Sequence, residues 1–295
     1  MNLFSNLYRQ RGVTMVEMIA VIVITGIIGA VVAVFIRLPV QSYTDSVARA
    51  AATDVADLAL RRITRDLRLA LPNSVRVTGP AAGPVFLEFL QTTAGLRYLA
   101  EDDVVGATPP VNYLNWNDPL KTSFDVVGVL PADRHAPVVG NFVVVYNLGE
   151  GQEPANAYNC ASAAGCNMAV ISAISGATIT MASNPFAAQT ASGVALMSPA
   201  KRAYVVTSAV TYGCDRTTGK LTRYWNYTIV KDQPTSFSDG NSALLAENIR
   251  GCNFVYANLA NQRSGLVGLT IDVGIAGQTS AKLTLEHQIH VDNTP

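Results

Sequence analysis

The longest apolar run in the chain lies near its N-terminus. Every residue from Met18 to Ile36 is apolar or glycine except Thr25. At about 1.5 Å of rise per residue, a helix over this run spans roughly 28 Å, close to the ~30 Å hydrocarbon core of a bilayer. A core helix of a soluble domain would show a polar face, and this run has none. We therefore predict a membrane-spanning helix.

A second helical pattern covers residues 41 to 71. Opposite charges lie four residues apart in the pairs Asp57–Arg61 and Arg62–Asp66, which is typical of an exposed helix face. Apolar residues recur at spacings of three and four, and we expect this stripe to be buried. Its members are Val47, Ala51, Val55, Leu58, Ala59, Ile63 and Leu67.

Two prolines and an arginine cluster refine this second pattern. Pro39 predicts a kink or a short interruption, because proline lacks an N–H and clashes with the preceding turn. The pair Pro72-Asn73 predicts the end of the helix. The arginines could contact acidic lipid or a neighbouring subunit, but a solvated face is the favoured interpretation. They are Arg61, Arg62, Arg65 and Arg68.

Beyond Pro72 the pattern indicates short strands separated by turns rich in Gly, Asn and Pro. The segment Phe142–Leu148 contains the run FVVVY, which predicts a strand buried on both faces. The clearest hairpins lie in the last hundred residues. The expected strands are Ser74–Thr78, Val85–Gln91, Gly95–Ala100, Val126–Leu130, Phe142–Leu148, Ala169–Ile174, Thr178–Met181, Arg202–Gly213, Lys220–Val230, Cys252–Ala257, Leu266–Ile275 and Lys282–Val291, and Ala243–Ile249 is a short helix or strand.

These patterns together predict an α+β fold. A long N-terminal helix, half in a membrane and half amphipathic, is followed by a mainly antiparallel β domain. The expected organisation is a leader at 1–12, a transmembrane helix at 13–38, an amphipathic helix at 39–72 and a β-rich domain at 73–295.

Charge and cysteine content narrow the class. The net charge is +0 at pH 7, so the basic footprint of a nucleic-acid-binding protein is missing. All four cysteines follow the apolar run, as expected for an oxidising compartment beyond a membrane. We favour the pairs Cys160–Cys166 and Cys214–Cys252, each contiguous along the chain. Four free, buried thiols are the alternative. A zinc site is disfavoured, because no C-x-x-C occurs and no His lies near a Cys in sequence.

The first twelve residues form a basic leader with Arg9 and Arg11 and no acid. An ordinary secretory signal places its apolar core before the cleavage site, whereas here the apolar run follows Gly12. Cleavage after Gly12 would leave the membrane helix on the mature protein. The arginines predict a cytoplasmic N-terminus, with the β domain on the opposite side of the membrane.

The stretch Gly12-Val13-Thr14-Met15-Val16-Glu17 resembles the cleavage site of type IV prepilins and type II secretion pseudopilins. The resemblance implies that prepilin peptidase cuts after Gly12 and methylates the new N-terminus at Val13, where the family most often has Phe. It also implies a single pass through the inner membrane with the β domain in the periplasm, and assembly with other pilin or pseudopilin subunits at an inner-membrane platform.

The position of Glu17 can also be interpreted without the family resemblance. A carboxylate at the start of a membrane helix is costly and needs a partner. The α-amino group created at Val13 by cleavage is the nearest suitable cation, either in the same subunit or in a neighbour. The alternative is that Glu17 lies at the headgroup level without a role.

No catalytic constellation is recognisable. The chain has three histidines and lacks G-x-S-x-G, H-E-x-x-H, P-loop and Rossmann patterns. His287 and His290 would point to opposite faces of a strand, and we expect His287 to pack in the core. We expect no enzymatic activity, no metal and no cofactor.

The sequence therefore predicts a minor pilin or pseudopilin that helps to initiate or cap a type IV pilus-like filament. Its size and layout resemble the large minor pilins of the MshO type in mannose-sensitive haemagglutinin pilus systems and the J-type pseudopilins of type II secretion. The alternatives are a membrane-anchored periplasmic enzyme or binding module, and a pilus-tip adhesin that contacts a surface through the loop 149–165.

Overall fold

A computed structural model of the chain describes residues 12–80, 83–105, 111–160, 165–256 and 263–295. The chain divides into two compact units, Met1–Ala51 and Ala52–Pro295. Of the predicted leader at 1–12, only Gly12 is described, so Arg9 and Arg11 lie outside the described residues.

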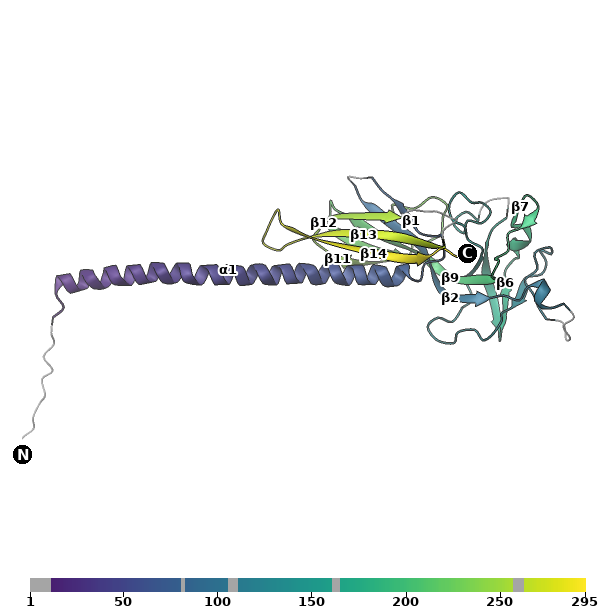
Figure 1. The fold of residues 1–295 in the computed structure, drawn as a ribbon, viewed down its shortest axis with the longest axis horizontal. Helices are drawn as coiled ribbons and strands as arrows, with labels where there is room; N and C mark the ends of the chain where they lie inside the picture. The colour runs from purple at the N-terminus through teal and green to yellow at the C-terminus, as the bar shows by residue number, and fades with distance from the viewer. Residues whose placement is uncertain (1–11, 81–82, 106–110, 161–164, 257–262) are drawn as a thin grey trace, which may run out of the picture. The chain divides into compact units, whose positions relative to one another are not determined.

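Helix α1 runs from Met15 to Leu67 and contains Pro39. The interruption expected at Pro39 does not occur, and Figure 1 shows the helix continuing without a break. One proline removes a single N–H and displaces one carbonyl, while the hydrogen bonds on either side of it remain. The membrane-type and amphipathic patterns therefore belong to one helix.

The part of α1 in the second unit buries a stripe that differs from the expected one. Leu58 is 68% exposed and Val55 is 37% exposed, whereas Ala56 is fully buried. Both stripes have the same spacing and share three residues, so periodicity alone did not separate them. Small alanines allow a helix to approach its neighbours closely. The buried residues are Ala52, Ala56, Ala59, Leu60, Ile63, Asp66 and Leu67.

The largest sheet has nine antiparallel strands. Its main order is β1-β2-β9-β4-β5-β6-β3, and β10 pairs with both β9 and β11. The strands are β1 Arg76–Thr78, β2 Val85–Arg97, β3 Ser123–Asp125, β4 Phe142–Val145, β5 Met168–Ser175, β6 Thr178–Met181, β9 Arg202–Asp215, β10 Lys220–Trp225 and β11 Asn241–Ala246.

Strand β9 is the centre of this sheet. β2 pairs with it along nearly its whole length, from Arg202 to Cys214. On its other edge, β4 pairs with residues 203–206 and β10 pairs with residues 210–215. One long strand therefore joins two sub-sheets that would otherwise have no common partner.

A second sheet has the order β12-β13-β14, and Figure 1 draws its strands as adjacent arrows. They are β12 Ile249–Tyr256, β13 Ser264–Gly274 and β14 Lys282–Asp292. The disulfide Cys214–Cys252 joins β9 to β12 and so links the two sheets. A small hairpin, β7 Thr190–Ala191 and β8 Val194–Ala195, and two 3-10 turns, η1 Glu101–Asp103 and η2 Pro185–Ala188, complete the elements.

Strand β4 separates two hydrophobic clusters. Val143 and Val145 belong to a cluster with Phe124 and Phe186, whereas Val144 faces a different cluster with Leu90. All three valines are fully buried. The strand is thus covered on both faces, as its continuous apolar run predicted.

Three of the expected strands differ most from the structure. The predicted strands Val85–Gln91 and Gly95–Ala100 form the single strand β2, whose register shifts near Thr92. The predicted strand Val126–Leu130 is wrong, since the strand here is β3, Ser123–Asp125. Val126 forms an isolated bridge to Tyr98, and residues 127–130 belong to no strand.

Asparagines tie the end of the helix segment to the end of the chain. The Asn73 amide nitrogen donates to the carbonyls of Asn147 and Asn293, at 2.9 and 3.1 Å. Asn147 in turn donates to the carbonyl of Pro72 at 2.7 Å. Both Asn73 and Asn147 are buried, so these bonds satisfy amide nitrogens that would be costly to leave unpaired, whereas the Asn73 Oδ1 has no partner among the described residues.

Candidate processing and assembly site

The predicted processing site lies just before the helix. Gly12, Val13 and Thr14 precede α1 and are exposed. Apart from its neighbours in the chain, no atom of the described residues lies within 4 Å of a Cβ built on Gly12. Among the described residues, nothing therefore covers the Gly12–Val13 peptide bond, which lies outside the helical hydrogen-bond ladder.

Thr14 is the N-cap of α1. Its hydroxyl oxygen accepts a hydrogen bond from the backbone N–H of Glu17 at 3.3 Å, and its carbonyl accepts from Met18 at 3.2 Å. A Thr followed three residues later by Glu is the sequence of a capping box. Sequence reasoning missed the role of Thr14, although this spacing signals it.

Glu17 lies in the first turn of the helix, where the partial positive charge of the helix N-terminus favours a carboxylate. Its side chain is exposed. The cap at Thr14 thus sets the position of Glu17 relative to Val13, four residues earlier in the chain.

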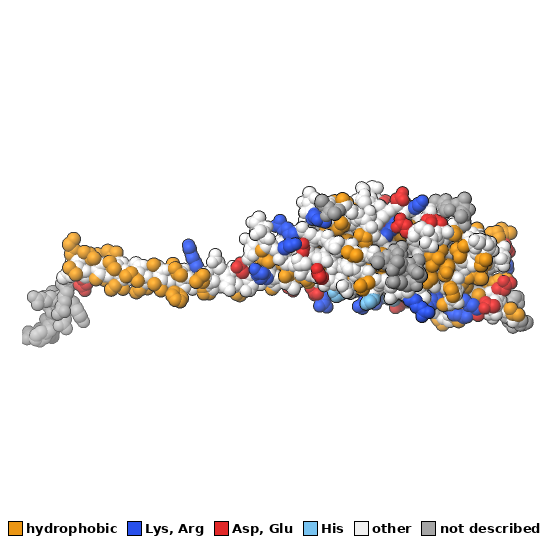
Figure 2. Space-filling model, turned by 45° about the horizontal axis from the view of Figure 1, so that its top comes forward, with side chains coloured by type: hydrophobic (Ala, Val, Ile, Leu, Met, Phe, Trp, Pro, Cys, Tyr) orange, Lys and Arg blue, Asp and Glu red, His pale blue; other side chains and the backbone are white. Residues whose placement is uncertain are grey.

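The following turns present an apolar surface with no protein cover. No part of the most apolar 18-residue stretch of α1 is buried, and it is long enough to cross a membrane. Thr25, the polar exception in the run, donates its hydroxyl to the carbonyl of Val21 at 2.6 Å and leaves no unsatisfied donor. Figure 2 shows hydrophobic side chains covering this part of the helix.

These features define a chain whose N-terminal helix can anchor it in a membrane and whose remainder forms a separate β-rich unit. Residues 7–33 match the family model of the prokaryotic N-terminal methylation motif. The N-terminal segment is therefore type IV pilin-like. No curated protein and no solved structure matches the chain.

The four cysteines form two disulfides, Cys160–Cys166 and Cys214–Cys252, the pairs that we favoured from the sequence. Both lie in the second unit, apart in sequence from the processing residues. Their placement assigns them to the β domain rather than to the N-terminal segment.

The histidines do not form a site. His287 is exposed, so the expectation that it packs in the core is wrong. His287 lies on β14, an edge strand of the β12–β14 sheet. The buried apolar residues of this strand are Ile289 and Val291, which lie closer to its C-terminal end. In the ranges that the structure describes, no group of three or more His, Cys, Asp or Glu is placed to hold a metal ion.

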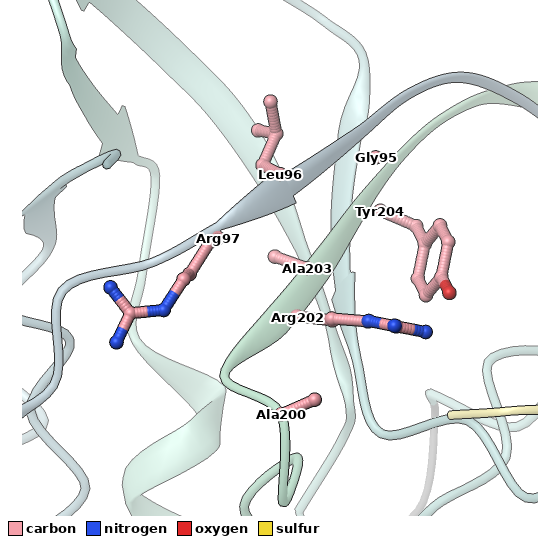
Figure 3. Close-up of a pocket in the computed structure, with 7 residues that line it drawn as sticks. All are labelled: Gly95, Leu96, Arg97, Ala200, Arg202, Ala203 and Tyr204. Atoms are coloured by element: carbon pink, nitrogen blue, oxygen red, sulfur yellow. The ribbon is translucent and has the colours of Figure 1, made fainter. Parts of the chain in front are cut away.

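A pocket of about 460 Å³ lies where β2 and β9 pair, lined by Gly95 to Arg97 and by Ala200 and Arg202 to Tyr204. Figure 3 shows the Arg97 side chain pointing away from those of Arg202 and Tyr204. Arg97 instead pairs with Asp103 at 2.9 Å. The pocket therefore does not gather its polar side chains around one point.

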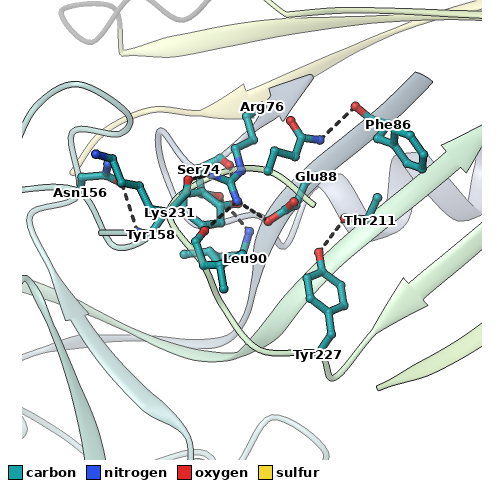
Figure 4. A network of polar contacts seen from close by, with 12 residues as sticks. Ser74, Arg76, Phe86, Glu88, Leu90, Asn156, Tyr158, Thr211, Tyr227 and Lys231 are labelled. Carbon is teal, nitrogen blue, oxygen red and sulfur yellow. Dashed lines mark hydrogen bonds and ion pairs between the residues drawn. The ribbon is translucent and has the colours of Figure 1, made fainter. Parts of the chain in front are cut away.

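A buried ion pair lies within the β domain. Arg76 contacts Glu88 at 2.8 Å, with the two side chains 7% and 0% exposed. Figure 4 shows this pair within a network of polar contacts. Arg76 also donates to the carbonyls of Val230 and Lys231, and its guanidinium lies 3.6 Å from the centre of the Tyr158 ring.

Burial changes the pKa of Glu88. Desolvation raises the pKa of Glu88 to about 7, although Arg76 opposes the shift. One carboxyl oxygen of Glu88 has no hydrogen-bond partner among the described residues, which is costly for a charged group. This pair could not be predicted from the sequence, because Arg76 and Glu88 are twelve residues apart and meet only through the β1–β2 register.

Proposed function

We propose that this protein is a minor pilin or pseudopilin, a structural subunit that polymerises through its N-terminal helix and helps to initiate or cap a type IV pilus-like filament. The observation that carries the proposal is the exposed apolar helix that follows an uncovered Gly12–Val13 bond within a methylation motif. Such a surface needs a cover, first lipid and then the helices of neighbouring subunits. The proposed role is structural rather than enzymatic.

The proposed topology places the N-terminus in the cytoplasm and the β domain in the periplasm. Arg9 and Arg11 before the apolar run support this orientation. The disulfides Cys160–Cys166 and Cys214–Cys252 support an oxidising compartment for the β domain. The partners implied are prepilin peptidase, other pilin or pseudopilin subunits, and the assembly platform of the inner membrane.

The proposed low-copy role rests on size. The second unit runs from Ala52 to Pro295 and carries two sheets and two disulfides. A large globular unit is harder to accommodate in every subunit along a tightly packed filament than in a single subunit at the filament's end. This supports an initiating or capping position, of the kind that the MshO-type minor pilins and J-type pseudopilins suggest by their layout.

Glu17→Ala tests the assembly mechanism. A carboxylate in an apolar filament core needs a cation, and cleavage supplies one at Val13. We expect membrane insertion of the variant to be unchanged, because the apolar run is intact. The amount of the variant recovered in the sheared filament fraction should fall roughly tenfold or more. This corresponds to a loss of at least ~1.4 kcal/mol of binding free energy per contact between subunits.

Thr25→Ala is the matched control, because the Thr25 hydroxyl bonds within its own helix. We expect its filament recovery to equal that of the wild type. If Glu17→Ala assembles normally, Glu17 has no part in the mechanism, and if both variants fail alike, the loss is not specific to the carboxylate.

A further inference from the structure

A pocket of about 790 Å³ in the β domain lies beyond the ends of β2 and β9. Tyr98 and Trp116 contribute to its floor, and Val105 and Met197 contribute apolar walls. Val105 is 84% exposed and Met197 is 48% exposed. Pockets of this size that combine apolar walls with a few polar groups are typical of binding sites.

One polar group on the floor is unsatisfied. Trp116 is 92% buried, and its indole Nε1–H has no acceptor among the described residues. Its ring contacts Tyr98 and Phe186, with centroids 6.4 and 5.7 Å apart, which fixes the indole in the core. A buried donor without an acceptor is costly, and an ordered water beside the indole would remove that cost.

The rim is held in a strained conformation. Lys201 has a φ of 55°, a left-handed value that is unfavourable for a residue with a side chain. Two backbone hydrogen bonds hold it there: its N–H donates to Ser198, and its carbonyl accepts from Tyr98. This conformation places the ammonium 2.6 Å from Asp102 and 2.9 Å from Asp103. Strain of this kind is concentrated at binding sites.

The rim remains acidic despite this pairing. Asp102 is 74% exposed, and its neighbour Glu101, which also lines the pocket, is exposed. A ligand with a positive charge beside an apolar group would match this arrangement. A saccharide fits less well, because Tyr98 and Trp116 are too deeply buried to offer a ring face for stacking.

We propose that this pocket is a docking site for an extended peptide segment of another protein, which inserts an apolar side chain next to a basic residue. The apolar side chain packs against Met197 and Val105, and the basic residue lies near Glu101 and Asp102. The site does not depend on processing at Gly12.

The test uses the full chain in detergent micelles with Trp225→Phe, which leaves Trp116 as the single tryptophan reporter. The probes are blocked tetrapeptides Gly-Leu-Arg-Gly, Gly-Leu-Glu-Gly and Gly-Ser-Arg-Gly, and methyl glucoside. We expect a saturable change in Trp116 emission with the Leu-Arg peptide. Binding of the Leu-Glu and Ser-Arg peptides should be weaker, by about threefold and tenfold respectively.

Met197→Asp and Val194→Asp form a matched pair of variants, because both residues are exposed apolar side chains and only Met197 lines the pocket. We expect Met197→Asp to weaken Leu-Arg binding about tenfold and Val194→Asp to change it less than about twofold. The proposal is overturned if the Leu-Arg peptide gives no saturable response, if the three peptides bind equally, if only methyl glucoside binds, or if the two variants behave alike.

Discussion

At the scale of single residues, Glu88 has the clearest consequence for pH dependence. Its pKa is about 7 in the folded protein and about 4.5 when unperturbed. Between these values the folded state binds more protons than the unfolded state, so the free energy of unfolding falls as pH rises through this window. The full difference is roughly 3 kcal/mol for one group.

Glu88→Gln removes this titration. We expect the variant to show a flatter dependence of unfolding free energy on pH between 5 and 8, since Arg76 keeps its contacts with two carbonyls and the Tyr158 ring. Urea unfolding of the detergent-solubilised chain at several pH values measures it. Glu286→Gln, at an exposed residue on β14, should keep the wild-type slope. A wild-type slope in Glu88→Gln would contradict the assignment.

At the scale of elements, helix α1 shows what packing adds to periodicity. The amphipathic pattern correctly predicted a helix with one buried face and included Ala59, Ile63 and Leu67 in it. It placed Leu58 on the wrong face, because a stripe of alanines has the same spacing as a stripe of larger residues. Which stripe is buried depends on contacts with strands more than a hundred residues away, such as the bond from Tyr212 to Asp66.

The buried stripe seen in the structure predicts a large loss of stability from a substitution at Ala56 and a small one at Leu58. Ala56→Leu adds three carbons to a fully buried site and should cost about 1–3 kcal/mol by overpacking. Leu58→Ala removes an exposed side chain and should change stability by less than about 0.5 kcal/mol. Urea unfolding of both variants measures this difference. A larger loss in Leu58→Ala would restore the stripe that the sequence suggested.

Among the strands, the sequence predicted those with strong alternation and clear turns. Thr178–Met181 matches β6, and the hairpins of the last hundred residues are present. It failed where one strand continues through a bulge, as in β2 near Thr92, and where an apolar run follows a short strand, as at Val126. Neither a bulge nor an isolated bridge changes the local pattern of residues.

At the scale of the whole molecule, the site was predictable only in part. Gly12, Val13 and Glu17 stand out in sequence because they precede a long apolar run. The pocket at Trp116 and the pair Arg76–Glu88 did not, since each is assembled from segments that only the fold brings together.

The disulfide that links the two sheets should matter most for stability of the β domain. Cys214 and Cys252 are 38 residues apart, and the loop-entropy relation gives a loss of about 4 kcal/mol when both are replaced by Ser. Cys160 and Cys166 are 6 apart, and the same relation gives about 2 kcal/mol. Urea unfolding of the two double variants checks the order, and an equal or reversed order would contradict it.

The central claim is that the N-terminal helix is both a processed segment and an assembly interface. The intact mass of the chain extracted from bacterial membranes that contain a prepilin peptidase tests it most directly. We predict the loss of residues 1–12, with one added methyl group on Val13. Retention of the leader on the membrane-extracted chain would contradict the claim.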